Sequence, residues 1–262
     1  MYRVAGMREH GHFRAMEAQH PLYEPDFYRS RYAALSLSEV MRFTSWWQVP
    51  IVYLTKGFIE SGDLDFLPGR DADVQAPESE LSSEARDAIN VYRPRFEALG
   101  YRAARFHVVR RTLNAQYRNG GGYIGLAADG LSAAFISYVR RQPPAGPEKR
   151  HTSLAVVGYL PGDHSFAVIN NLVYLDPIPG SRVVRLNSDD PAKLLEAFQK
   201  EVRRHQPPLV SMPDSARLAE LMDRNAVAIH RYRVEVRRLY VRATPAEIAA
   251  AERRMPAPPL PR

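Results

Sequence analysis

Cysteine is absent from this 262-residue chain. Its absence excludes disulfide bonds, thiolate nucleophiles and every zinc site built on cysteine ligands. The common enzyme signatures are missing too: there is no phosphate-binding loop followed by Lys and Ser or Thr, no His-Glu-x-x-His and no Gly-x-Ser-x-Gly. The sequence therefore predicts no cofactor and no reaction of a recognisable class.

Long apolar runs are also scarce. The run at 49–54 is far too short to cross a bilayer, and residues 1–25 lack the basic start and long apolar stretch of a signal peptide. Hydrophobic content of 45% and charged content of 25% are ordinary for a globular protein with a real core. We therefore expect a soluble cytoplasmic protein.

Lysine is rare, since it supplies four of the 36 basic residues and arginine supplies the others. The formal net charge is +7, and the charge is unevenly spread. Residues 60–87 carry an excess of acidic side chains, whereas 93–150 carry an excess of arginine. This distribution predicts that the acidic segment contacts or shields the basic one.

The central stretch, 101–171, consists of short segments rich in Val, Ile, Tyr, Phe and Ala that are separated by turn residues. Asp129-Gly130 lies between two of them, and an Asp-Gly pair between apolar runs is a strong hairpin signal. Pro161-Gly162 is typical of another turn. The pattern predicts an antiparallel β-meander of about five strands in an α+β fold, with Ile136, Val156 and Val168 buried.

Helical patterns surround the meander. One helix is expected from Ser82 or Ser83 to Leu99, interrupted near Pro94, and another from Pro191 after an Asp190 cap. The preceding helix and the C-terminal helices should cover the sheet. Further expectations are a helix from Glu39 capped by Ser36 or Ser38 and broken before Pro50, a loop at 62–80, an edge strand at 182–186 and a short helix from Pro245.

Residues 213–242 show apolar side chains at alternating spacings of four and three, which is typical of a helix that packs along one seam. Residues 231–237 instead alternate polar and apolar side chains, which is typical of a strand. We favour a continuous helix packed on the chain's own sheet, and a monomer over a dimer formed through this helix. The arginines of this segment should then face water.

These patterns divide the chain into four parts. Residues 1–79 form an aromatic arm and an acidic loop, and 80–206 form a core domain of helix and sheet. Residues 207–255 form a helical segment, and 256–262 form a disordered proline-rich tail.

Candidate catalytic residues are few. His151 and His164 flank the predicted fourth and fifth strands and could converge near Asp163 for acid–base chemistry, although a histidine at a strand end is more often a surface residue. Metal ligands could come from His10 and His12 or from the aspartates at 63–65 and 71–73. Because these pairs lack the further ligands of a known metal loop, we predict no metal.

Nucleic-acid binding is a second possibility. Arginines interleaved with aromatic residues can neutralise phosphates while the rings stack on bases. The candidates are Arg105, Arg110, Arg111, Arg140 and Arg141. Gly120-Gly-Gly122-Tyr-Ile-Gly125 matches dinucleotide-binding spacing, but a strand rather than a helix should follow it, so we discard that function.

Both tryptophans, Trp46 and Trp47, lie in an aromatic segment. They are expected to pack on the sheet, with contact to a membrane surface or a protein partner as the less favoured alternative. A curved sheet crossed by a helix also forms a concave apolar pocket without any motif. We therefore expect a non-enzymatic domain that binds a small ligand or a protein, with an enzyme and a weak electrostatic nucleic-acid binder as alternatives.

Overall fold

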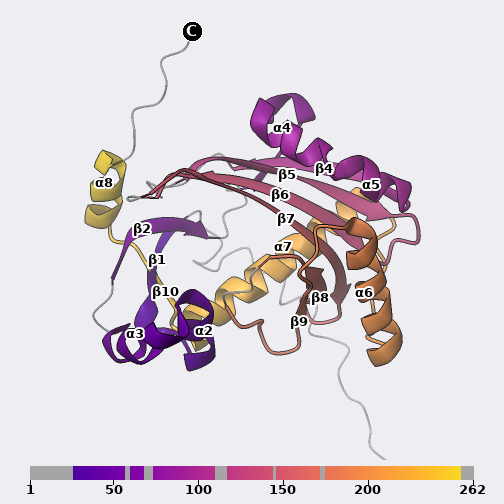
Figure 1. The fold of residues 1–262 in the computed structure, drawn as a ribbon. Coiled ribbons are helices and arrows are strands. Elements are labelled where there is room, and N and C mark those ends of the chain that lie inside the picture. Colours follow the sequence, from indigo (N-terminus) through magenta and orange to yellow (C-terminus); the bar gives the residue numbers. More distant parts are fainter. Residues whose placement is uncertain are drawn as a thin grey trace, which may run out of the picture.

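The computed structural model describes residues 26–56, 60–67, 73–109, 117–143, 146–171 and 175–254. Their strands form one large and one small sheet, with helices packed around them (Figure 1). The predicted α+β class is confirmed. The segment 1–25, with His10 and His12, and the tail at 256–262 lie outside the described residues.

Within the described residues the large sheet has seven strands in the order β3-β4-β5-β6-β7-β8-β9. Their bounds are β3 Asp73–Ala76, β4 Tyr101–Val109, β5 Tyr117–Ala127, β6 Ala133–Arg141, β7 Lys149–Leu160, β8 His164–Ile169 and β9 Arg182–Arg185. Strands β4 to β8 pair successively as antiparallel neighbours, which confirms the predicted meander and its turn at Asp129-Gly130. At the edges, β3 pairs antiparallel with β4 and β9 parallel with β8.

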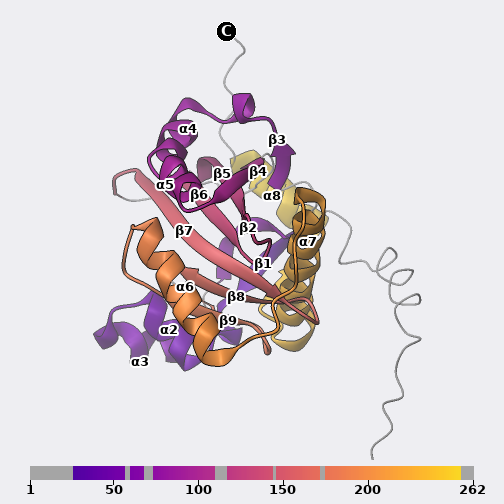
Figure 2. The ribbon, with the colours of Figure 1, turned by 90° about the vertical axis from the view of Figure 1, so that its right-hand side faces the viewer.

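Three helices cover one face of this sheet (Figure 2): α4 Ser83–Asn90, α5 Arg93–Ala98 and α6 Pro191–His205. Ser82 caps α4, and Asp190 caps α6 with Pro191 in the first turn, as predicted. The break between α4 and α5 falls at Val91 and Tyr92, and Pro94 lies in the first turn of α5. The core beneath the helices contains Ile136, Val156 and Val168, all fully buried, so the predicted core is confirmed.

Helix α7, Ser215–Arg231, lies on the opposite face (Figure 2). Its Leu218 and Leu221 join a second core with residues of β5, β6 and β7, which confirms that the helix packs on the chain's own sheet. The predicted continuation of this helix to Arg242 is wrong. A π-helical turn at Tyr232–Val236 follows, Arg238 adopts a left-handed backbone with φ of 51°, and the chain then enters a strand.

The small sheet has the order β10-β1-β2 among the described residues, with β10 Tyr240–Arg242, β1 Asp26–Arg31 and β2 Glu60–Leu67. The loop expected at 62–80 is therefore wrong, since most of β2 and all of β3 lie within it. The segment that includes Asp63 and Asp65 is polar, but it forms strand β2 because it pairs with β1. Helices α2 Leu37–Phe43, α3 Val49–Thr55 and α8 Pro245–Arg254 accompany this sheet.

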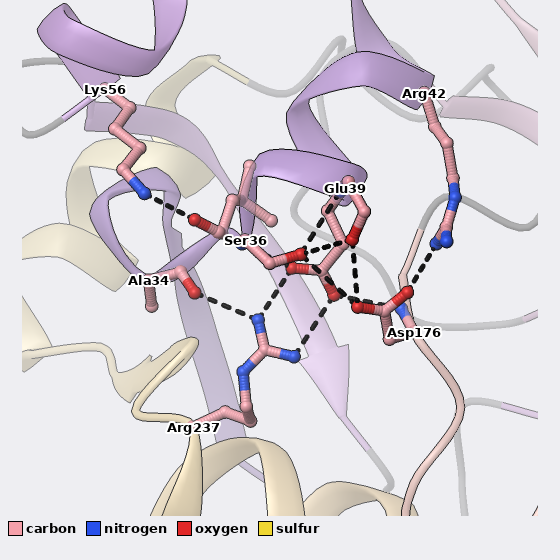
Figure 3. A network of polar contacts seen from close by, with 9 residues as sticks. Ala34, Ser36, Glu39, Arg42, Lys56, Asp176 and Arg237 are labelled. Carbon is pink, nitrogen blue, oxygen red and sulfur yellow. Dashed lines mark hydrogen bonds and ion pairs between the residues drawn. The ribbon is translucent and has the colours of Figure 1, made fainter.

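A buried carboxylate holds this smaller unit together (Figure 3). Glu39 of α2 is fully buried, and its Oε2 lies 2.6 Å from a guanidinium nitrogen of Arg237. The backbone N–H groups of Ser36 and Asp176 also donate to this carboxylate. Burial alone would raise the pKa of Glu39, but the hydrogen bonds from Arg237 and from the two backbone groups outweigh it and hold the pKa at about 2. The pair thus fastens α2 to the chain that follows α7.

Candidate ligand-binding pocket

A cavity of about 390 Å³ lies between helix α6 and one end of the large sheet. Its walls come from the end of α5 and the start of β4, the turn between β5 and β6, helix α6 and the segment after it. Apolar side chains make up most of the lining, namely Leu99, Leu131, Leu195, Phe198, Val202 and Leu209. Concave, mostly apolar cavities of this size are typical of small-molecule sites.

The turn between β5 and β6 is held in place at the cavity by the segment after α6. Met212 donates its N–H to the carbonyl of Gly130, and Val210 donates to the carbonyl of Tyr159. Gly130 has φ of +66°, and a Cβ there would come within 2.7 Å of the Met212 carbonyl oxygen. Only glycine fits both the conformation and the close approach. The Asp-Gly pair that predicted the hairpin thus also fixes one wall of the pocket.

Two hydroxyl groups form a polar patch in the otherwise apolar wall. The Tyr101 hydroxyl lies 3.0 Å from Ser132 Oγ, and both residues are buried. Burial raises the pKa of Tyr101 to about 12; the Ser132 hydrogen bond lowers it somewhat, and the Asp129 charge raises it. Tyr101 is therefore neutral near pH 7. One hydroxyl hydrogen is used between the two oxygens, so one remains to donate.

Charged and polar side chains line the same cavity. Asp129, Gln199 and Arg203 are exposed there, and one carboxylate oxygen of Asp129 accepts the N–H of Leu131. The lining therefore carries both signs of charge beside a neutral polar patch. This arrangement suits a small molecule with an apolar body and one hydrogen-bond acceptor.

The structure does not bring the predicted acid–base residues together. His164 pairs with Leu160 at one end of β7, whereas His151 pairs with Val139 near the other end. Nine residues of strand separate His151 from Leu160, or about 30 Å. Asp163 is also engaged, since its carboxylate lies 2.6 Å from a guanidinium nitrogen of Arg224. The expected convergence at Asp163 is wrong.

The predicted arginines are likewise dispersed. Arg140 lies between Glu84 of α4 and Glu148, at 2.8 and 2.7 Å, so its charge is already paired. These contacts confirm that the acidic segment touches the basic one. Arg105 is half-buried on β4, and Arg141 is exposed at the end of β6. Arg110 and Arg111 lie outside the described residues.

The pocket residues carry little signal in the sequence. Tyr101 and Ser132 are 31 positions apart, and the sequence alone indicates only an aromatic residue in a strand and a polar residue in a turn. The hairpin turn already explains Asp129, so this residue gave no indication of a pocket. One clue was available: α6 has a broad apolar face, of which Leu194 is fully buried in the core while Leu195, Phe198 and Val202 also line the cavity.

Comparisons of the chain with protein-family models, with curated proteins and with solved structures find no match. Across the residues that the structure describes, no helix is long and apolar enough to span a membrane. The same residues contain no group of three or more His, Asp or Glu side chains placed to bind a metal ion. Functional inference therefore rests on the geometry of the chain itself.

Proposed function

We propose that this protein binds a small, mostly apolar molecule in the cavity between α6 and the turn joining β5 to β6. The observation that carries the proposal is the combination of a 390 Å³ apolar cavity with the buried Tyr101–Ser132 hydroxyl pair. A buried hydroxyl with a hydrogen left to donate is costly unless a ligand or water accepts it. A bound carbonyl or hydroxyl oxygen would satisfy it.

The chemistry of the lining limits the ligand. The apolar walls favour an aromatic or branched aliphatic body, and the hydroxyl pair favours a single acceptor. Asp129 and Arg203, of opposite charge, give no net preference for an anion or a cation. We therefore propose a neutral ligand at the lower end of the size range of small-molecule sites.

The test is a screen of small fragments by ligand-observed NMR, with two matched variants of α6. Gln199 and Lys200 are adjacent and exposed, but only Gln199 lines the cavity. Gln199→Trp should fill the mouth and abolish saturable binding, whereas Lys200→Trp should bind as the wild type does. Tyr101→Phe should weaken fragments that carry a carbonyl by about fivefold, the value of one hydrogen bond. Absence of any saturable binding, or binding unaffected by Gln199→Trp, would refute the proposal.

Acid–base catalysis by the sheet histidines is less well supported, because none of His107, His151 and His164 lines this cavity. Nucleic-acid binding through Arg140 is opposed by its two carboxylate partners. The cytoplasmic location predicted from the sequence is part of the proposal, and fractionation of cells expressing the protein would test it.

A further inference from the structure

Helices α2 and α3, with the 3₁₀ turn Trp46–Gln48 between them, present a row of large apolar side chains to solvent. Trp46 is 84% exposed and Leu54 is 78% exposed, so the expectation that the tryptophans pack on the sheet is wrong. Five further members of this surface, here called the α2–α3 patch, are exposed as well: Leu37, Met41, Trp47, Ile51 and Tyr53. Single exposed apolar residues are normal, but seven large ones within residues 37–54 indicate a candidate interaction surface.

These exposed side chains do not contribute to the core of the small unit. The inner sides of α2 and α3 supply Val40, Val49 and Val52, which pack with Leu239 and Tyr240. Leu35, which precedes α2, belongs to the same cluster. Both ribbon views place α3 at the edge of the molecule, away from the large sheet (Figures 1 and 2). The α2–α3 patch is therefore available for a partner while the fold beneath it is complete.

The charge around the patch indicates what kind of partner fits. Between 32 and 56 the sequence has one acidic residue, Glu39, and it is fully buried against Arg237. The patch residues themselves therefore include no exposed carboxylate, and the partly exposed Asp176 beside α2 is paired with Arg42 at 2.7 Å. Arg31 and Arg238 lie beside the core beneath the patch, since the N–H of Arg31 donates to the carbonyl of Leu239, the residue on which α2 and α3 pack.

The two arginines lie in a basic crevice. Arg31, Arg238 and Arg242 line a hollow of about 290 Å³ together with Tyr28 and Tyr240. Within the part of the chain that the structure describes, the guanidinium groups of Arg31 and Arg238 make no ion pair. Arg238 is also held in the left-handed backbone region, with φ of 51°, which costs energy for a side chain other than glycine.

We propose that the α2–α3 patch docks on the surface of an anionic lipid bilayer. Tryptophan and tyrosine are favoured at the boundary between headgroups and acyl chains, and Leu54 and Ile51 can enter the apolar layer. Arg31 and Arg238 then face the phosphates of anionic headgroups. A second copy of this chain fits less well, because pairing through the same face would bring these unpaired cations together.

The position of the tryptophans makes the proposal directly measurable. The chain has two tryptophans, and both lie in the patch, so intrinsic fluorescence reports on this surface alone. In buffer we expect the red-shifted emission and ready acrylamide quenching of exposed indoles. Vesicles of phosphatidylcholine with phosphatidylserine should shift the emission to the blue, protect it from quenching and sediment the protein. Vesicles of phosphatidylcholine alone should do so much less.

Matched surface variants separate insertion from charge. Leu54→Ser should lower the partition coefficient on anionic vesicles by about tenfold. Val91→Ser, a change of another exposed apolar residue in the turn between α4 and α5, should leave it unchanged. The double variant Arg31→Glu/Arg238→Glu should lower it by about tenfold and weaken its dependence on salt. Circular dichroism and a thermal melt confirm that each variant is folded.

Three results would overturn the proposal. One is the absence of sedimentation with anionic vesicles. Another is equal loss of binding in Val91→Ser and Leu54→Ser. The third is tryptophan emission that is already blue-shifted in buffer, together with a dimer that Leu54→Ser dissociates, which would assign the patch to self-association. The pocket variant Gln199→Trp should keep full vesicle binding, so this outcome is independent of the proposed ligand.

Discussion

The two sheets of this protein are stabilised in different ways. The large sheet is built from consecutive antiparallel neighbours and buries a continuous apolar core beneath α4, α5 and α6. The small sheet joins β1, β2 and β10, and β10 lies about 200 residues further along the chain than β1. Its apolar clusters are small, and the buried Glu39–Arg237 pair joins α2 to the segment that precedes β10.

This difference concerns function as much as stability. A sheet built on local hairpins and a large core is rigid, and it provides the fixed walls of the pocket at Tyr101 and Ser132. A unit that depends on one ion pair and a few apolar contacts opens more easily. Both exposed tryptophans are attached to that second unit. The proposed ligand site and the proposed membrane surface therefore lie on parts of unequal stability.

The largest expected effect is in the core of the large sheet. Ile136 is fully buried between β5 and β7, so Ile136→Ala should lower the free energy of unfolding by about 2–5 kcal/mol. Denaturant titration followed by far-UV circular dichroism measures it. Val91→Ala, at an exposed position, is the control and should change the value by less than about 0.5 kcal/mol. A loss that small for Ile136→Ala would mean that this side chain does not support the core.

The second effect is local to the small unit. Glu39→Gln leaves the Arg237 charge without its partner in a largely buried site, which should cost about 3 kcal/mol. Hydrogen exchange should show loss of protection in β1, α2 and β10, while β5, β6 and β7 stay protected.

The double variant Glu39→Gln/Arg237→Met removes both charges and is the control for this change. It should recover part of the lost stability, because no unpaired charge is then buried. Equal loss of protection across both sheets in Glu39→Gln would show that the two units open together, against the comparison drawn above.

Acid should also open the small unit first. His230 is buried between Tyr28 and Tyr240, and neither of its ring nitrogens has a hydrogen-bond partner among the described residues. Burial, and then the charge of Arg233, lower its pKa to about 4. Between pH 6.5 and 4 the unfolded chain is protonated at His230 and the folded protein is not. The free energy of unfolding should therefore drop by about 2 kcal/mol as the pH is lowered through this range.

Denaturant titrations followed by far-UV circular dichroism at several pH values between 6.5 and 4 measure this loss of stability. His230→Phe keeps an aromatic ring but cannot titrate, so it should be less sensitive over that range. Between pH 4.5 and 2 both proteins should weaken further. Glu39 takes up a proton in the unfolded chain at its ordinary pKa of 4.5, whereas the folded protein holds that pKa at about 2. Identical pH profiles for the wild type and His230→Phe would contradict this assignment.

The contrast between the sheets also explains what could be predicted from the sequence. The meander and the burial of Ile136 follow from local signals, because alternation and the Asp129-Gly130 turn act within a few residues. The small sheet has no such signal, since β1 and β10 pair although about 200 residues separate them in the sequence. The strand at Tyr240–Arg242 therefore looked like the end of a helix.

The same limit applies to the site. His151 and His164 appeared to flank one hairpin, but the short turn at Pro161-Gly162 pairs His164 with Leu160, which leaves His151 far along β7. Register within a hairpin is counted from its turn, and that count excludes the pair. The pocket joins Tyr101 and Ser132 to α6 only through tertiary packing. Neither spacing nor residue type indicates that contact.

The smallest expected effect comes from the ion pairs on the large sheet, and it sharpens the comparison with Glu39. Arg140 bridges Glu84 and Glu148 at distances as short as those of the buried pair, but all three side chains are about 30% exposed. Water already solvates these charges, and salt screens them. Arg140→Met should therefore change the denaturation midpoint far less than Glu39→Gln does, and added salt should remove most of the difference from the wild type. Parallel titrations of both variants at low and high salt measure this.

The opposite result would be that Arg140→Met lowers the free energy of unfolding as much as Glu39→Gln does, and that this loss does not change with salt. The attachment of α4 to the sheet would then depend on the Arg140 network, and short ion pairs would stabilise both units alike.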